Sequence, residues 1–363
     1  MNKKISDAEF RESIDRRLSA LRPDPWMAKR IIASERGEKK VKKISGFVIV
    51  TAIILILTIA TAIAAAIGGW RLDSMLGMTE EQKENYQETG LLDEPQLSVE
   101  KNGVTVTLDQ CVAVPQAAYI AFRVKGYPVQ PGQEPGFGTI ECQSVHGETF
   151  LGWSASFLSE EAENGKYTYA DENGDLLLCF IVSPSDSDVS LAGMEVRVVL
   201  DDLGASAGKA EDVIPGVKGP WEFEWTLKGT DRRADLTDLS EPIGEDGCVL
   251  TEAHLTPLSI DMRMIVPREL NANSVMDDAV PYFSGVRYAD GTVLADLNNS
   301  GGGGYESRES SAYGERVTLN RVIEPEQVES LLFYWNADWG NDDLPGWDEE
   351  EHEPVLYEVK IRK

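Results

Sequence analysis

One uninterrupted apolar run limits what this chain can fold into. Residues 47–67 are all Phe, Val, Ile, Leu, Ala or Thr, and no charged residue occurs between Ile44 and Trp70. As a helix rising about 1.5 Å per residue, these 21 residues span roughly 30 Å, the thickness of a membrane's hydrocarbon core. The run therefore predicts a transmembrane helix within residues 44–69.

The charged residues around the run indicate its orientation. The chain has a formal charge of −28, but residues 1–43 hold thirteen Lys and Arg against seven Asp and Glu; this head carries +6, and the rest must carry −34. Cations cluster just before the run, at Arg36, Lys39, Lys40, Lys42 and Lys43. The positive-inside rule then predicts a single-pass protein of the cell membrane, with its N-terminus in the cytoplasm and an extracellular acidic body. The acidic excess also excludes nucleic acid as a partner.

Two alternatives to a transmembrane helix stay open. A helix buried in a soluble domain rarely reaches 21 consecutive apolar residues. A cleaved signal peptide is the stronger alternative, because Ala62, Ala64 and Ala66 offer small-residue cleavage sites. However, the preceding 43 residues are long for a signal peptide, and the apolar run exceeds the usual length of roughly 7–15 residues.

The head, residues 1–43, is predicted to form two short amphipathic helices. Ser6 and Glu9 have the spacing of a capping box, and Pro23 and Pro25 separate the two helices. Because so short a segment cannot bury a core alone, its apolar side chains are expected to contact a partner. That partner is either the lipid surface or a groove in a cytoplasmic protein, unless the head is only a flank that sets topology. The predicted partner-binding residues are Phe10, Ile14, Leu18, Leu21, Trp26 and Ile31.

The body is predicted to be mainly β, with two Ig-like β-sandwich domains outside the membrane. Residues 70–95 are expected to form a stalk with a short helix after Thr79, whose spacing to Gln82 matches a capping box. Short strands separated by Gly, Pro, Asn and Asp then predict a first sandwich over residues 96–230 and a second over residues 231–363. Residues 221–227 alternate between apolar and polar side chains, and residues 176–182 are continuously apolar, as in a central strand.

A loose internal repeat supports two related sandwiches. Residues 103–124 and 247–266 both begin with Gly and a strand of apolar residues and Thr. Both turn at a proline, Pro115 or Pro257, and resume as an alternating strand. Two sandwiches with unrelated sequences but the same strand pattern would also produce this likeness.

Short stretches along nearly the whole chain resemble a bacterial family of single-pass membrane proteins, the domain of unknown function 4179. They are Asp24-Pro25-Trp26, Lys29-Arg30-Ile31-Ile32, Met78-Thr79-Glu80-Glu81-Gln82, Gly103-Val104-Thr105-Val106-Thr107-Leu108, Leu255-Thr256-Pro257-Leu258 and Asp290-Gly291-Thr292. The resemblance implies an anti-sigma-factor-like protein for signal transduction, with a cytoplasmic sigma factor as partner of the head.

No motif points to an enzyme, a cofactor or a metal. The three histidines are more than 90 residues apart, and no nucleophile motif accompanies them. The acidic stretch 171–175 lacks the acid that an EF-hand needs at its twelfth position, which is Val182, so a turn is favoured there. Three cysteines fall in the first predicted sandwich and one in the second, so they cannot all pair within domains; we favour free thiols for Cys111, Cys142, Cys179 and Cys248.

Tryptophans near the C-terminus are the best candidates for an outer ligand surface. Trp335, Trp339 and Trp347 stand among Asn and Asp residues, and exposed rings beside such groups can stack on sugars. The alternative, which is the commoner outcome for such clusters, is that these rings pack inside the domain. Residues 300–305, with four glycines, are expected to form a flexible hairpin tip. The alternative function is therefore a surface-anchored module for an unidentified glycan or protein ligand, with no regulatory role in the cytoplasm.

Overall fold

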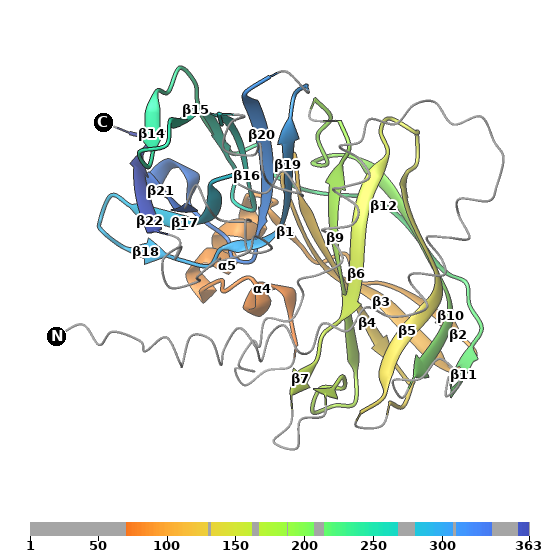
Figure 1. Cartoon of the computed structure of the whole chain (residues 1–363). Coiled ribbons are helices and arrows are strands. Elements are labelled where there is room, and N and C mark those ends of the chain that lie inside the picture. Colours follow the sequence, from red (N-terminus) through yellow and green to blue (C-terminus); the bar gives the residue numbers. More distant parts are fainter. Residues whose placement is uncertain are drawn as a thin grey trace, which may run out of the picture.

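The computed structural model of the protein describes residues 70–129, 132–161, 167–186, 188–206, 214–267, 280–307, 310–335 and 355–362. The predicted head (1–43) and transmembrane helix (44–69) lie outside these residues. Across the described part of the chain, no helix is both long and apolar enough to cross a membrane. The fold is mainly β, as predicted, and consists of several antiparallel sheets (Figure 1).

The first half of the described chain forms two sheets that pack face to face. Sheet 1 has the order β1-β3-β4-β9-β6, and β2 pairs with the start of β3. Its strands are β1 (Leu92–Asp93), β2 (Leu97–Lys101), β3 (Val104–Ala113), β4 (Ala118–Lys125), β6 (Leu151–Phe157) and β9 (Leu176–Pro184). In sheet 2, β10 (Glu195–Ser206) lies between β5 (Glu134–Ser144) and the strands β11 (Ile214–Val217) and β12 (Trp221–Thr226). The short strands β7 (Glu160–Glu161) and β8 (Tyr167–Thr168) pair separately.

Side chains from both sheets fill the core of this first sandwich. In β12 the aromatic residues are buried and the two intervening glutamates are exposed, which confirms the predicted alternation. β9 lies between β4 and β6, and its residues 176–182 are buried on both faces, which confirms the predicted central strand. Phe122 of sheet 1 contacts Phe223 of sheet 2, with ring centroids 5.0 Å apart.

The second half forms another pair of sheets around a separate core. Sheet 3 has the order β13-β15-β16-β20-β19, with β14 also on β15, and sheet 4 has the order β18-β17-β21-β22. The strands of sheet 3 are β13 (Ala234–Leu236), β14 (Glu241–Ile243), β15 (Cys248–Leu255), β16 (Ser259–Ile265), β19 (Asn298–Tyr305) and β20 (Ala312–Leu319). Those of sheet 4 are β17 (Tyr282–Tyr288), β18 (Val293–Leu294), β21 (Val328–Trp335) and β22 (Val355–Lys360), and the 3-10 helix η2 (Pro325–Gln327) precedes β21.

The same strand order occurs in both sandwiches. In chain order, the main strands of the first are β3, β4, β5, β6, β9, β10 and β12, and those of the second are β15, β16, β17, β19, β20, β21 and β22. In each set the first, second, fifth and fourth strands form one sheet in that order, and the third, sixth and seventh form the other. The repeated sequence segments form the hairpins β3–β4 and β15–β16, and each hairpin carries a register shift in its first strand.

The four glycines of residues 301–304 lie in strand β19, so the prediction of a hairpin tip is wrong. β19 pairs with β20 from Asn298 to Tyr305. A Cβ on Gly303 would lie 2.3 Å from the hydroxyl oxygen of Tyr313 in the neighbouring strand. Glycine is therefore needed here so that a tyrosine can lie across the adjacent backbone.

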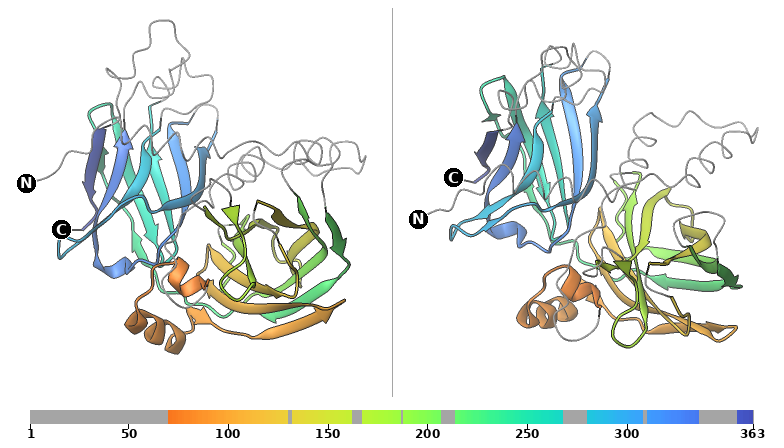
Figure 2. Two further views of the ribbon diagram at one scale, coloured as in Figure 1. Left: turned by 90° about the horizontal axis from the view of Figure 1, so that it is seen from below. Right: turned by 60° about the horizontal axis from the view of Figure 1, so that its bottom comes forward.

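Residues 70–91, which we call the strap, pack between the two sandwiches where a separate stalk was expected. They contain α4 (Leu72–Met75) and α5 (Glu80–Glu88). The capping box before α5 is confirmed, because Thr79 accepts from the Gln82 amide at 3.2 Å and Gln82 Oε1 accepts from the Thr79 amide at 3.0 Å. Figure 2 shows both helices, in orange, beside the junction of the two sandwiches.

Candidate functional site

The strap covers an apolar area on the outer face of sheet 1. That face consists of residues of β3, β4 and β9 whose side chains point away from the first core: Val112, Tyr119, Ala121, Leu177, Cys179 and Ile181. The strap contributes Leu72, Leu76, Tyr86 and Leu91, each at most 1% exposed, and the second sandwich contributes Leu258 and Val322. One apolar cluster thus joins the strap to both sandwiches.

A β-bulge in β3 places two polar side chains beneath the strap. The register shifts between Leu108 and Gln110, so Asp109 is an extra residue in the strand. Asp109 is 6% exposed and Gln110 is fully buried. Because buried polar groups need hydrogen-bond partners, these two side chains organise the network that surrounds them.

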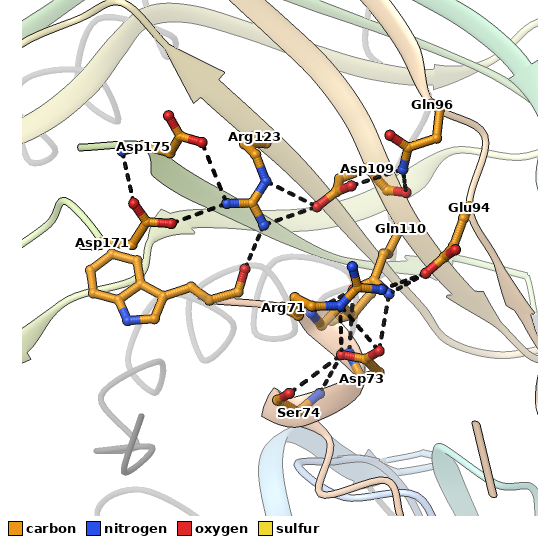
Figure 3. A network of polar contacts seen from close by, with 12 residues as sticks. Arg71, Asp73, Ser74, Glu94, Gln96, Asp109, Gln110, Arg123, Asp171 and Asp175 are labelled. Carbon is orange, nitrogen blue, oxygen red and sulfur yellow. Dashed lines mark hydrogen bonds and ion pairs between the residues drawn. The ribbon is translucent and has the colours of Figure 1, made fainter. Parts of the chain in front are cut away.

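Arg123 of β4 holds the start of the strap (Figure 3). Its Nη2 donates to the carbonyl oxygen of Trp70 at 2.6 Å and to Asp109 Oδ2 at 3.1 Å. Its Nη1 donates to Asp171 Oδ2 at 3.3 Å, and the Asp175 carboxylate lies 3.9 Å away. One guanidinium therefore joins the strap, the bulge and the turn after β8.

The acidic stretch 171–175 forms a turn, as the sequence favoured. Asp171 Oδ1 accepts the backbone amides of Asn173 and Asp175, both at 2.9 Å. Its other oxygen accepts from Arg123, so both carboxylate oxygens have partners within the protein.

Gln110 holds the first turn of α4. Its Oε1 accepts the amide of Leu72 at 2.8 Å, and the amide of Asp73 lies 3.4 Å from the same oxygen. Its Nε2 donates to Asp73 Oδ2 at 3.3 Å and to Glu94 Oε1 at 3.0 Å. A side chain of sheet 1 therefore provides the partners that the free amides at this helix start require.

Asp73 is the most buried charge on the strap, and two cations compensate it. Lys83 of α5 lies 2.9 Å from Oδ2 and Arg71 lies 3.3 Å from it; Arg71 also reaches Glu94 at 2.5 Å. Burial alone would raise the pKa of Asp73, but the hydrogen bond from Lys83 and the charge of Arg71 outweigh it and hold that pKa below its ordinary value.

The network has the composition of a structural joint. Its carboxylates and cations nearly balance: Asp73, Glu94, Asp109, Asp171 and Asp175 against Arg71, Lys83, Arg123 and Lys125. Among the described residues, no group of three or more His, Cys, Asp and Glu is arranged to hold a metal ion. The contacts join protein groups to one another, and what they fix is the position of the strap on sheet 1.

Tyr119 extends this joint into the second sandwich. It is fully buried, donates its hydroxyl to the carbonyl oxygen of Leu319 at 2.7 Å, and accepts from Asn299 Nδ2 at 2.7 Å. Nearby, Arg316 Nη1 donates to the carbonyl oxygen of Pro184 at 3.1 Å. Direct hydrogen bonds thus link the two sandwiches beside the strap.

The residues that the sequence singled out do not meet at this joint. Trp335 is fully buried in the second core, where its Nε1 donates to Asp246 at 3.0 Å, so it offers no ring to an outer ligand. Trp339 and Trp347 lie outside the described residues, as do Phe10, Ile14, Leu18, Leu21, Trp26 and Ile31 of the head.

The cysteines and two histidines occupy separate places in the described structure. All four cysteines are free and buried, as favoured from the sequence. His146 pairs with Glu195 at 2.8 Å on the first sandwich, and His254 pairs with Asp235 at 2.8 Å on the second.

The joint was not predictable from neighbouring residues, because its members are far apart in the chain. The available signal was the pair Asp109-Gln110 inside a strand that begins with alternating apolar residues, together with Leu72 and Leu76, which are one helical turn apart and more than 30 residues earlier in the chain. Only the fold shows that the second pair covers the first.

Comparison with known proteins gives little further information. No family model matches the chain, and no curated protein matches it. Among solved structures it is similar to a conserved domain protein from Bacillus anthracis. That similarity has a TM-score of 0.47 at 15% sequence identity and covers 77% of this chain and 93% of that chain.

Proposed function

We propose that the protein is a single-pass membrane regulator in which the strap connects an extracytoplasmic body to a cytoplasmic partner-binding head. The apolar run of residues 47–67 and the cations before it support this placement. The resemblance to anti-sigma-factor-like membrane proteins supports a sigma factor as the partner of the head.

We further infer that both sandwiches are Ig-like. A sheet of the first, second, fifth and fourth strands facing one of the third, sixth and seventh is the strand order of constant-type immunoglobulin domains. Domains of this architecture commonly bind ligands with their end loops, which is consistent with a sensing role.

The observation that carries the proposal is the burial of the strap. Trp70 follows the apolar run after only two glycines, and its carbonyl oxygen already accepts a hydrogen bond from Arg123. Leu72 and Leu76 are then fully buried between the sandwiches. A body attached in this way passes a change in its own packing to the chain that enters the membrane, whereas a flexible stalk would absorb it.

The test is capture of partners by the tagged full-length protein from bacterial membranes. We expect a sigma factor to be recovered with the wild-type chain and lost when Phe10, Ile14 and Leu18 are changed to Ser. A matched variant with Arg11, Glu12 and Asp15 changed to Ser alters the opposite helix face and should still recover it. Recovery of no sigma factor, or equal recovery with both variants, would remove the regulatory proposal.

The alternative, a surface-anchored binding module, predicts a different result. In that case, deletion of residues 3–35 should leave binding of the outer ligand unchanged. This deletion keeps the basic cluster before the apolar run. Protease treatment of intact cells tests the placement itself. Both functions place the sandwiches outside the cell, so the added protease should digest them.

A further inference from the structure

Three parts of the molecule meet at one carboxylate of the second sandwich. Glu324, just before η2, accepts a hydrogen bond from the hydroxyl group of Tyr86 in the strap. Its Oε2 lies 2.6 Å from Nη2 of Arg232, in the linker between β12 and β13. Arg232 also binds Glu326 in a bidentate pair at 2.9 and 2.6 Å. The strap, the linker and the second sandwich thus meet in one set of polar contacts, beside the hydrogen bonds of Tyr119 and Arg316 that join the two sandwiches directly.

The strap is held less firmly to the second sandwich than to the first. On the first sandwich it has the Arg123 and Gln110 contacts and most of the apolar cluster. On the second, apart from Tyr86, it has a hydrogen bond from the Val322 amide to the Leu76 carbonyl at 3.2 Å and packing against Leu258 and Val322. Tyr86 is only 1% exposed and the Glu324 side chain is 19% exposed, so the hydrogen bond between them is partly shielded from water.

We propose that Tyr86, Glu324 and Arg232 form a hinge lock. When the contact between Tyr86 and Glu324 breaks, the second sandwich turns about the linker, residues 227–233, and the hydrogen bonds of Tyr119 and Arg316 between the two sandwiches break with it. Leu76 and Tyr86 then lose their cover on the side of the second sandwich, so the strap loosens from sheet 1 while both sandwiches stay folded. The use of this motion in signalling rests on the proposed function, since the strap continues from the predicted membrane helix. The motion itself is a property of the described body.

A cysteine beneath the strap can report this opening. Cys179 is fully buried on the outer face of sheet 1, and its Sγ lies 3.6 Å from Met75 Sδ of α4. Burial raises the pKa of the Cys179 thiol to about 12, so the group is protonated and unreactive while the strap is in place. Cys111 and Cys142 belong to the first core and Cys248 to the second, so they become accessible only when a sandwich opens.

The experiment is pulsed labelling of the purified full-length chain in detergent with N-ethylmaleimide, and mass spectrometry then gives the labelling rate of each cysteine. Tyr86→Phe removes the donor of the hydrogen bond to Glu324, and Glu324→Gln removes the charge that strengthens this bond and pairs with Arg232. We expect them to raise the labelling rate of Cys179 by about tenfold or more, with no change at Cys111. Lys228→Ala is the matched control. It removes an ion pair between the linker itself and Asp93, and because the Lys228 side chain is 67% exposed, this change should alter neither rate.

Three results would overturn the hinge lock: no acceleration at Cys179, equal acceleration at Cys179 and Cys111, or the same acceleration in the Lys228 variant. Arg232→Gln provides a second test, because it weakens the lock from the linker side and should also accelerate Cys179 alone. No cytoplasmic partner is present in this measurement, so its failure is separate from failure of the capture experiment.

Discussion

Replacing Arg123 with methionine should destabilise the body by about 3–5 kcal/mol, because it removes one partner of a buried ion pair. Methionine retains an apolar stem but cannot pair with Asp109 or Asp171, whose side chains are 9% and 2% exposed. The carbonyl oxygen of Trp70 loses its donor as well. The Arg123 side chain is itself 16% exposed, so water reaches the site and the lower end of this range is expected.

The assay is urea unfolding of the full-length chain in detergent at pH 7, followed by circular dichroism. Arg197→Met on β10 is the matched control, since Arg197 also contacts two carboxylates, Glu222 at 2.7 Å and Glu141 at 3.9 Å, but on an exposed face. Arg197→Met should therefore lose clearly less stability than Arg123→Met. Adding Asp109→Asn to the Arg123 variant should restore part of the stability, because it removes one uncompensated charge. A loss under about 1 kcal/mol for Arg123→Met, or one equal to that of Arg197→Met, would refute the argument for a buried joint.

Three further predictions use the same unfolding assay. The pKa of Asp73 in the folded protein lies below its ordinary value of 3.8. Its carboxylate therefore adds stability that is complete above pH 3.8 and is lost as the pH falls through the lower pKa of the folded state. Asp73→Asn should lose stability at pH 7 and approach the stability of the wild type in acid. Burial raises the pKa of Glu315 to about 8, and its Oε2 has no hydrogen-bond partner in the described structure. The contribution of Glu315 to stability is therefore present below pH 4.5 and lost as the pH rises through 8. The free energy of unfolding of Glu315→Gln should exceed that of the wild type by on the order of a few kcal/mol at pH 9 and equal it at pH 4. Equal stability of the two proteins at pH 9 would contradict this. Tyr119→Phe should cost about 1–3 kcal/mol, because the buried carbonyl of Leu319 and the amide of Asn299 lose the hydroxyl group between them, and a neutral result would show that water replaces it.

Features set by neighbouring residues were predictable from the sequence. The alternation in β12, the continuous apolar run of β9 and the capping box at Thr79 each depend on spacings of a few residues, and the structure confirms all three. The prediction of a hairpin tip for the four glycines of β19 was wrong, because it used their composition alone. Glycine is present at position 303 because Tyr313 of the next strand leaves no room for a Cβ.

The joint itself was not predictable from local pattern. Arg123 stands opposite to the buried face of β4 and has the spacing of a solvent-exposed residue, yet Trp70, 53 positions earlier, lies over it. Trp335 shows the reverse case. The Asn and Asp residues that follow it suggest exposure, but the alternation of β21 places its ring inside the second core.

The two sandwiches share a strand order, but the outer face of sheet 3 is polar and the corresponding face of sheet 1 is apolar. On sheet 3 this face carries ion pairs such as Asp261 with Arg316 at 2.8 Å, whereas sheet 1 presents Leu177 and Ile181. A recombinant fragment that begins at the first strand, Leu92, would lack the strap, expose the apolar outer face of sheet 1 to water and should aggregate. Anyone preparing the outer portion for crystallisation or ligand screening should therefore begin the expressed polypeptide no later than Trp70.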